Sequence, residues 1–256
     1  MSDDFSSPAA IKKQPVFSTA FQAILLGLLL YLVPPTIASI VLVLALQATG
    51  MSGSDIEVWF QDATLAQFLY VAITESLVIA ALIFLVRFAK IKIKDIGIRK
   101  PALSHIQYVI GGFMLYYVVY IVIAVIVSRL TNINLDQEQE IGFNTDVSGG
   151  SLLLAGLSLV ILPPLVEEIL FRGYLYNRLR QVLSFAWSAF ILSLLFGAAH
   201  LQLGSGNSPL WIAAIDTFIL SLVLVYIREK TGTIWAGVAI HALKNAVAFV
   251  VLFHIL

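Results

Sequence analysis

Several polar side chains of this 256-residue chain interrupt stretches that are otherwise strongly apolar. Such groups are costly to bury, so they usually mark a functional site or a specific partner. The densest occurrence is LPPLVEEILFRGYLY at 162–176, where two glutamates are followed closely by an arginine. The whole set consists of Glu75, Glu167, Glu168, Arg172, His200, Asp216, His241, Lys244 and Asn245.

The spacing of Glu168 and Arg172 predicts an ion pair on one helix face. The two are four residues apart with the glutamate on the N-terminal side, which is the favourable orientation. Glu167 lies roughly 100° away around the same helix and does not share that partner directly. Arg172 therefore neutralises Glu168, and Glu167 remains a free carboxylate.

A predicted hairpin brings Glu167 to the depth of a histidine on the next helix. The best turn is at Leu183-Ser184, and Glu167 and His200 each lie 16 residues from it. At about 1.5 Å per residue, both are roughly 24 Å from the turn on antiparallel neighbours. His241 and Asn245, four apart on one face of the last apolar segment, are expected at a similar depth.

Together these groups could hydrolyse a peptide bond without a covalent intermediate. A glutamate can act as general base on a water that a histidine helps to orient. A second histidine and an asparagine amide could donate hydrogen bonds to the developing oxyanion. Glutamate and two histidines could instead hold a divalent metal. The sequence contains no H-E-x-x-H zinc motif and no G-x-S-x-G nucleophile motif.

Each of these residues also has an ordinary structural explanation. A single histidine or asparagine inside the membrane commonly bonds a neighbouring helix, and a glutamate–arginine pair can fix helix register. Glu75 and Asp216 are isolated in the sequence and are expected to be neutral, hydrogen-bonded structural groups. Lys244 faces another side of its helix from His241, so it is expected to reach the surface or to pair with an acid.

The composition identifies the elements that must carry these groups. The chain is 60% hydrophobic and only 12% charged, and its mean hydropathy is +0.96, whereas a soluble domain is about a quarter charged. It is therefore expected to be an all-α, polytopic bundle of transmembrane helices. The absence of cysteine excludes disulfides and thiolate sites, and zero net charge argues against nucleic acid as a partner.

About seven spans are expected, and the first should kink at Pro34-Pro35. Basic residues follow the second, fourth and sixth spans, while the alternate loops are acidic, including the one at 132–146. The positive-inside rule therefore places the N-terminus and the basic loops in the cytoplasm. The basic segment 90–106 is expected either as a surface segment in the headgroup region or as an ordinary loop. The expected spans are 20–46, 65–87, 106–128, 151–171, 185–203, 210–227 and 234–256.

Three motifs resemble those of a known family. EEILFR at 167–172, FGAAH at 196–200 and HALKN at 241–245 are similar to the E-E-x-x-x-R, F-x-x-x-H and H-x-x-x-N/B motifs of the CPBP family. This family comprises the type II CAAX prenyl endopeptidases and their bacteriocin-processing relatives, also called Abi proteins. The resemblance in order and spacing covers roughly residues 151–250.

The resemblance implies a role for each matching residue. Glu167 would be the catalytic base, His200 would help to hold the water, and His241 and Asn245 would stabilise the oxyanion. Glu168, Arg172 and Phe196 would support the site. We expect no required cofactor; a divalent metal such as zinc, if bound, would use Glu167, His200 and His241.

The family further implies an organisation and a setting. Residues 1–19 would form a cytoplasmic tail, 20–150 an N-terminal transmembrane region and 151–256 the catalytic transmembrane domain. The protein would be a multi-pass protein of a prokaryotic cell membrane, in contact with lipid. Its substrate would be a peptide or protein, either prenylated or bacteriocin-like.

Two other functions fit the same polar residues. One is a non-catalytic membrane immunity factor or adaptor that binds a partner through the polar core. An adaptor, however, has no need for His200 and Asn245 together. The other is a proton-coupled transporter, which the lack of an internal repeat and of paired broken helices disfavours.

Overall fold

The chain folds as an all-α bundle of membrane-spanning length. The computed structural model describes residues 16–131, 142–201 and 209–255, so the N-terminal tail to residue 15 and residues 132–141 of the acidic loop lie outside the described residues. Six helical segments in this part of the chain are long and apolar enough to cross a membrane. They confirm the expected polytopic helical fold. Five are the single helices α1 (Val16–Ala48), α3 (Thr64–Phe88), α4 (His105–Leu130), α9 (Trp211–Thr231) and α10 (Trp235–Leu252).

The sixth segment is a composite of five helical pieces that runs without a break from residue 149 to 180. It is longer than the expected span at 151–171 and includes two π-helical stretches, one that ends just before Pro163 and one that contains Arg172. A proline lacks the N–H of a regular helical turn and its ring crowds the preceding turn, so the widened turn before Pro163 has a direct cause. The pieces are α5 (Gly149–Gly156), η1 (Leu157–Ile161), α6 (Leu162–Glu167), η2 (Glu168–Leu175) and α7 (Tyr176–Arg180).

Two other helices complete the described elements. The segment expected as the fifth span is α8 (Phe185–Ala199), which has only 15 residues. At about 1.5 Å per residue it measures roughly 22 Å, less than the ~30 Å hydrocarbon core. The bundle thus has six segments of spanning length and one shorter apolar helix rather than seven equal spans. Helix α2 (Gly53–Asp62), which the sequence analysis missed, begins where the Ser52 hydroxyl accepts a hydrogen bond from the Asp55 amide.

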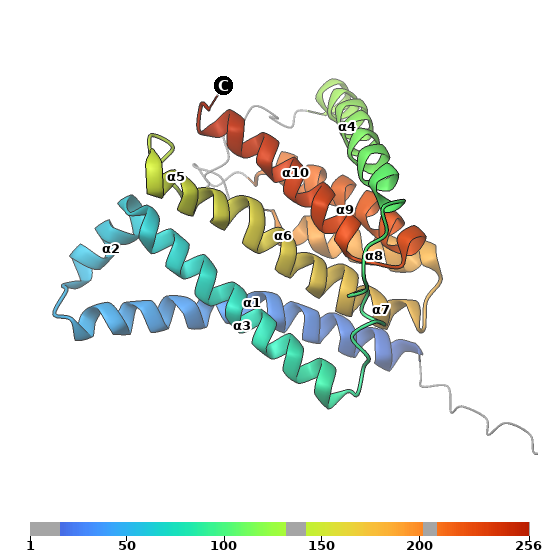
Figure 1. Ribbon diagram of the computed structural model, residues 1–256, viewed down its shortest axis with the longest axis horizontal. Helices are drawn as coiled ribbons and strands as arrows, with labels where there is room; N and C mark the ends of the chain where they lie inside the picture. The colour runs from blue at the N-terminus through green and yellow to red at the C-terminus, as the bar shows by residue number, and fades with distance from the viewer. Residues whose placement is uncertain (1–15, 132–141, 202–208, 256) are drawn as a thin grey trace, which may run out of the picture.

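The composite segment lies between two groups of helices (Figure 1). Helices α1 and α3 pack against one side of it, and α10 packs against η1 and α6 from the other. Helix α9 contacts α4, α8, α10 and η2, which makes it the most enclosed span. It thereby contacts all three segments that carry the predicted catalytic groups: α8, α10 and the composite segment.

The outer surface of the bundle is apolar. Helix α4 exposes Ile110, Met114, Val118, Ile121 and Val125 along one face. These side chains would be unfavourable in water and are suited to contact lipid. The single helix α1 is continuous across Pro34 and Pro35.

The basic loops gather at one end of the molecule. The carbonyl of Asp95 accepts hydrogen bonds from Asn177 (2.8 Å) and Arg228 (3.3 Å). The carbonyl of Gly97 accepts one from the Thr233 hydroxyl (3.1 Å). The segment 90–104 consists of turns and extended residues, and Ile96 within it is buried. It is therefore a loop that is docked onto the bundle by these contacts, and its position in the headgroup region stays a prediction.

Candidate active site

Three segments bring Glu167 between two histidines. Glu167 ends α6, His200 caps the C-terminus of α8, and His241 lies in α10. The Glu167 Oε1 atom is 4.0 Å from His200 Nε2, and its Oε2 atom is 3.9 Å from His241 Nε2. These three side chains line a cavity of about 200 Å³ together with Asn245. The structure thus brings together the groups that the sequence predicts to meet.

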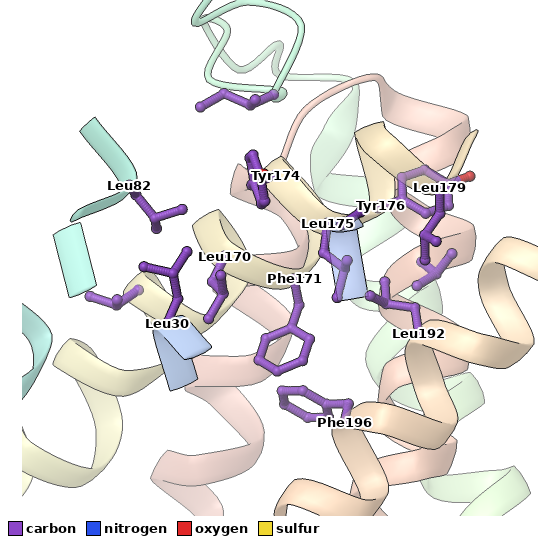
Figure 2. Packing of buried hydrophobic residues seen from close by; sticks show 14 of the residues in the cluster. Leu30, Leu82, Leu170, Phe171, Tyr174, Leu175, Tyr176, Leu179, Leu192 and Phe196 are labelled. Carbon is purple, nitrogen blue, oxygen red and sulfur yellow. The ribbon is translucent and has the colours of Figure 1, made fainter. Parts of the chain in front are cut away.

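Glu168 and Arg172 form the predicted ion pair. Arg172 Nη1 lies 2.7 Å from Glu168 Oε1, and both side chains are fully buried. The Arg172 guanidinium also lies 4.4 Å above the centre of the Phe196 ring, a cation–π contact. Phe196 in turn meets Phe171 edge-on at 4.9 Å, as Figure 2 shows. Phe196 therefore supports the arginine and sits one helical turn before His200.

His241 connects the two glutamates, a contact that the sequence analysis missed. Its Nδ1 atom is 3.3 Å from Glu168 Oε1, while its Nε2 atom faces Glu167. When Glu168 is ionised, the proton in this contact belongs to His241 Nδ1, because a carboxylate only accepts hydrogen bonds. The Nε2 atom can then donate a hydrogen bond only when the imidazole carries both protons.

The tautomer of His200 follows from its own hydrogen bond. His200 Nδ1 is 2.8 Å from the carbonyl oxygen of Phe196, and a carbonyl only accepts, so Nδ1 carries the proton. In the neutral ring, Nε2 is then an acceptor that faces Glu167 Oε1. Two acceptors 4.0 Å apart are too far for a direct hydrogen bond and are suited to share one water that donates to both.

Asn245 satisfies a carbonyl that its own helix cannot. Its Nδ2 atom donates to the carbonyl oxygen of Leu159 at 2.9 Å. The residues four and five positions after Leu159 are Pro163 and Pro164, so neither an α-helical nor a π-helical turn can supply an N–H to this carbonyl. The amide nitrogen has two protons, and the second is available to the cavity.

Comparison with known proteins agrees with this geometry. Residues 149–247 match the family of type II CAAX prenyl endopeptidase Rce1-like proteins. The chain contains an Rce1-like domain. A comparison with curated proteins found no match, and a comparison with solved structures found none either. The matched residues include all three motifs on which the resemblance to the CPBP family rests, and that resemblance is confirmed.

A second ion pair lines the cavity of the Rce1-like domain. Lys244 Nζ is 2.8 Å from Asp216 Oδ2, and both residues border the same cavity as Glu167. Tyr116 of α4, which precedes the domain, donates its hydroxyl proton to Asp216. The expected hydrogen bond of Asp216 is therefore confirmed, its expected neutrality is wrong, and the pairing of Lys244 with an acid is confirmed. Tyr116 was missed because a tyrosine in an apolar helix gives no signal of its own.

Glu75 has no partner from the described protein. It makes no hydrogen bond or ion pair there, so its expected hydrogen-bonded role stays a prediction. It lines a separate cavity on the side of the domain that faces α1 and α3.

A divalent metal, if bound, is expected to use Glu167, His200 and His241 as ligands. Across residues 16–131, 142–201 and 209–255, no three acidic or histidine side chains are placed so that they could hold a metal ion. Both Nε2 atoms point at Glu167 oxygens, and this arrangement fits a bridging water better than a tetrahedral ion. Metal dependence stays a prediction for the experiment below.

Proposed function

We propose that the protein is an intramembrane endopeptidase of the CAAX prenyl protease type in which Glu167 activates the hydrolytic water. The observation that carries this proposal is the position of Glu167 between the Nε2 atoms of His200 and His241. All three line one cavity; Glu167 and His241 come from segments of membrane-spanning length, and His200 caps the shorter apolar helix α8. A carboxylate that pairs with neither Arg172 nor Lys244 and lies beside two imidazoles is suited to general base catalysis.

The reaction can be followed atom by atom. A water held between Glu167 Oε1 and His200 Nε2 gives one proton to Glu167 while its oxygen attacks the peptide carbonyl carbon. The carbonyl oxygen becomes an oxyanion, which accepts hydrogen bonds from doubly protonated His241 and from the free amide proton of Asn245. Glu167 then transfers its proton to the leaving nitrogen, the C–N bond breaks, and a carboxylic acid and an amine form; the acid passes its proton to the amine, so that a carboxylate and an ammonium group leave the site and Glu167 is again a carboxylate.

Glu168 and Arg172 act through His241 in this scheme. The arginine fixes the Glu168 carboxylate at 2.7 Å, and the carboxylate fixes the Nδ1 proton of His241. The ring is thereby oriented with Nε2 toward the cavity. The two adjacent glutamates have different tasks because only one of them has a cationic partner.

We also propose a class of substrate. A peptide segment that reaches a cavity inside a membrane protein must itself be apolar or carry a lipid, so we propose a peptide with a prenylated C-terminus, with an unmodified bacteriocin-like peptide as the alternative. We further propose a metal-independent reaction, and a site open to the cytoplasm, on the side of the basic loops.

Purified protein in lipid vesicles tests the proposal. Parent protein and Glu167→Gln are incubated with matched prenylated and unprenylated peptides, with and without chelator, and the products are mapped by mass. We expect cleavage by the parent only, and the same cleavage in chelator. Equal cleavage by both proteins would exclude Glu167 as the base, and intact peptides with the parent would contradict peptidase activity on this class. Loss of parent activity in chelator would restore the metal mechanism.

A further inference from the structure

A second cavity reaches Glu167 from the side opposite the candidate active site. It has a volume of about 240 Å³ and lies among α1, α3 and the composite segment. Tyr31 comes from α1, Thr74 and Glu75 come from α3, and Glu167 and Leu170 come from the composite segment. Glu167 also lines the cavity that holds the two histidines, so this one side chain forms part of both walls.

Polar groups without partners face this second cavity. The Thr74 hydroxyl belongs to a residue that is 9% exposed and has no hydrogen-bond partner within the described chain. Glu75, which is partly exposed, makes no hydrogen bond or ion pair in that part of the chain. Glu167 lines the same cavity, although its Oε2 atom faces His241. Buried polar groups are nearly always bonded to protein or to water. The unpartnered Thr74 hydroxyl, next to the Glu75 carboxyl group, therefore points to a polar ligand in this cavity.

Water fits the size and chemistry of the cavity. One water occupies about 30 Å³ of liquid and needs two to four polar partners. The cavity has room for several waters, and a carboxyl group, a hydroxyl group and a carboxylate oxygen can bond them. The Tyr31 hydroxyl, which donates to the Ala199 carbonyl at 3.4 Å, can still accept a further hydrogen bond.

We propose that this cavity is a water-binding site that supplies the hydrolytic water to Glu167, with Thr74 and Glu75 as its positioning residues. This inference rests on the proposed function. Hydrolysis consumes one water for every peptide bond, and a bound peptide covers the face of Glu167 beside His241 and Asn245. The cavity of Thr74 and Glu75 leaves the other face of Glu167 open to water while the substrate is bound.

The hydration of the cavity can be measured without any activity, because the chain contains no cysteine. Thr74→Cys places a single thiol on the cavity wall. Ser76→Cys is the matched control, two residues away on the same helix with an exposed, lipid-facing side chain. Only the thiolate reacts with a water-soluble methanethiosulfonate, and thiolates form in water, so we expect Thr74→Cys to react at least about tenfold faster than Ser76→Cys.

The rates also discriminate between water and an apolar occupant. Slow reaction of both thiols would overturn the proposal. So would a Thr74→Cys thiol that reacts only with an apolar maleimide, because this result would assign the cavity to a lipid chain. Either outcome is independent of whether the protein is a peptidase.

The catalytic part is tested by kinetics on a peptide that the parent cleaves. Thr74→Val and Glu75→Leu keep approximate shape but remove a polar contact to water, so we expect kcat to fall about tenfold, the scale of one lost hydrogen bond. KM should stay unchanged, and Glu75→Gln, which still bonds water, should recover most of the loss. Unchanged kcat in Thr74→Val and Glu75→Leu, or a change confined to KM, would overturn the role in water supply even if the cavity is hydrated.

Discussion

Arg172 is among the largest side chains of the described protein that are fully buried. The groups that neutralise its charge determine which of the two adjacent glutamates is paired. Glu168 takes one side of the guanidinium at 2.7 Å, and the Phe196 ring covers one of its faces. The Nε and Nη2 atoms have no hydrogen-bond acceptor in the described chain, so this carboxylate and this ring carry most of the compensation. The arginine thereby holds Glu168 where it can accept a hydrogen bond from His241, and it forms no ion pair with Glu167.

Arg172→Met should destabilise the protein severely. The variant leaves the Glu168 carboxylate buried without its cation, which costs on the order of 3–5 kcal/mol. Adding Glu168→Gln to the same chain should recover much of this loss, because a neutral amide replaces the orphaned charge. The midpoint of thermal unfolding in detergent measures both effects. Arg178→Met, at a partly exposed arginine of the same segment, is the control and should change stability by less than about 0.5 kcal/mol. If Arg172→Met alone were as stable as the parent, the Glu168–Arg172 ion pair would contribute nothing to stability.

Residue contacts within one helix could be predicted from the sequence, and contacts between helices only in part. Glu168 and Arg172 share a helix face at four-residue spacing, and they remain paired even though their turn is π-helical. The bond from His241 to Glu168 depends on the rotation of α10 about its own axis, which no spacing determines. The contact of Tyr116 with Asp216 joins helices 100 positions apart and required the fold.

At the scale of elements, the composite segment shows how prolines shape the site. Pro163 and Pro164 interrupt the hydrogen bonds of the preceding turn, which is π-helical, and leave the Leu159 carbonyl without a donor of its own helix. Asn245 of α10 donates a hydrogen bond to this carbonyl and so connects α10 to the composite segment. A sequence reading could identify the prolines but not the helix that compensates for them.

The structural and catalytic roles of Asn245 can be separated with Pro163. Asn245→Ala leaves the Leu159 carbonyl unsatisfied, so we expect a loss of about 1–3 kcal/mol of stability together with loss of peptidase activity. Adding Pro163→Ala restores an N–H four residues after Leu159 and should recover the stability but not the activity. Unfolding midpoints and kcat, measured on both variants and on Pro163→Ala alone, decide between the roles. Recovery of activity in the double variant would assign Asn245 to structure only.

Close packing of α8 on α9 sets the position of His200. A methyl group added at Gly197 would lie 2.8 Å from the Ala214 carbonyl oxygen and 3.0 Å from Phe218 Cβ, so the two helices would have to separate. Gly197→Ala should therefore cost about 1–3 kcal/mol and lower kcat, because His200 follows three residues later. Gly111→Ala in α4 meets nothing within 4 Å and should be neutral or stabilising by up to about 1 kcal/mol. Equal unfolding midpoints for the two variants would contradict this account.

At the scale of the whole molecule, hydropathy predicted the apolar helices of the described bundle. It did not predict which of them are long enough to cross the membrane. All seven expected segments are helical, yet α8 ends at residue 199, short of spanning length. Its last turn leads into His200 beside Glu167, so the helix ends where the site needs a side chain. Hydropathy cannot report this, because an apolar helix that stops inside a bundle has the same composition as one that crosses.

Sidedness is the prediction that depends on the whole arrangement. The loop at 90–104 and the α9–α10 turn lie at one end of the bundle, whereas α2 and the end of α10 lie toward the other (Figure 1). The exposed positions Lys92, Ser54 and His254 can each receive a single cysteine in this cysteine-free chain. An impermeant maleimide added outside intact cells should label Ser54→Cys and His254→Cys but label Lys92→Cys only after lysis, since basic loops stay in the cytoplasm. Labelling of Lys92→Cys and His254→Cys from the same side would mean that the chain crosses the membrane an even number of times between these positions. Because the Gly97–Thr233 hydrogen bond keeps the α9–α10 turn beside the loop at 90–104, the helix α10 would then have to return to that side instead of crossing the membrane.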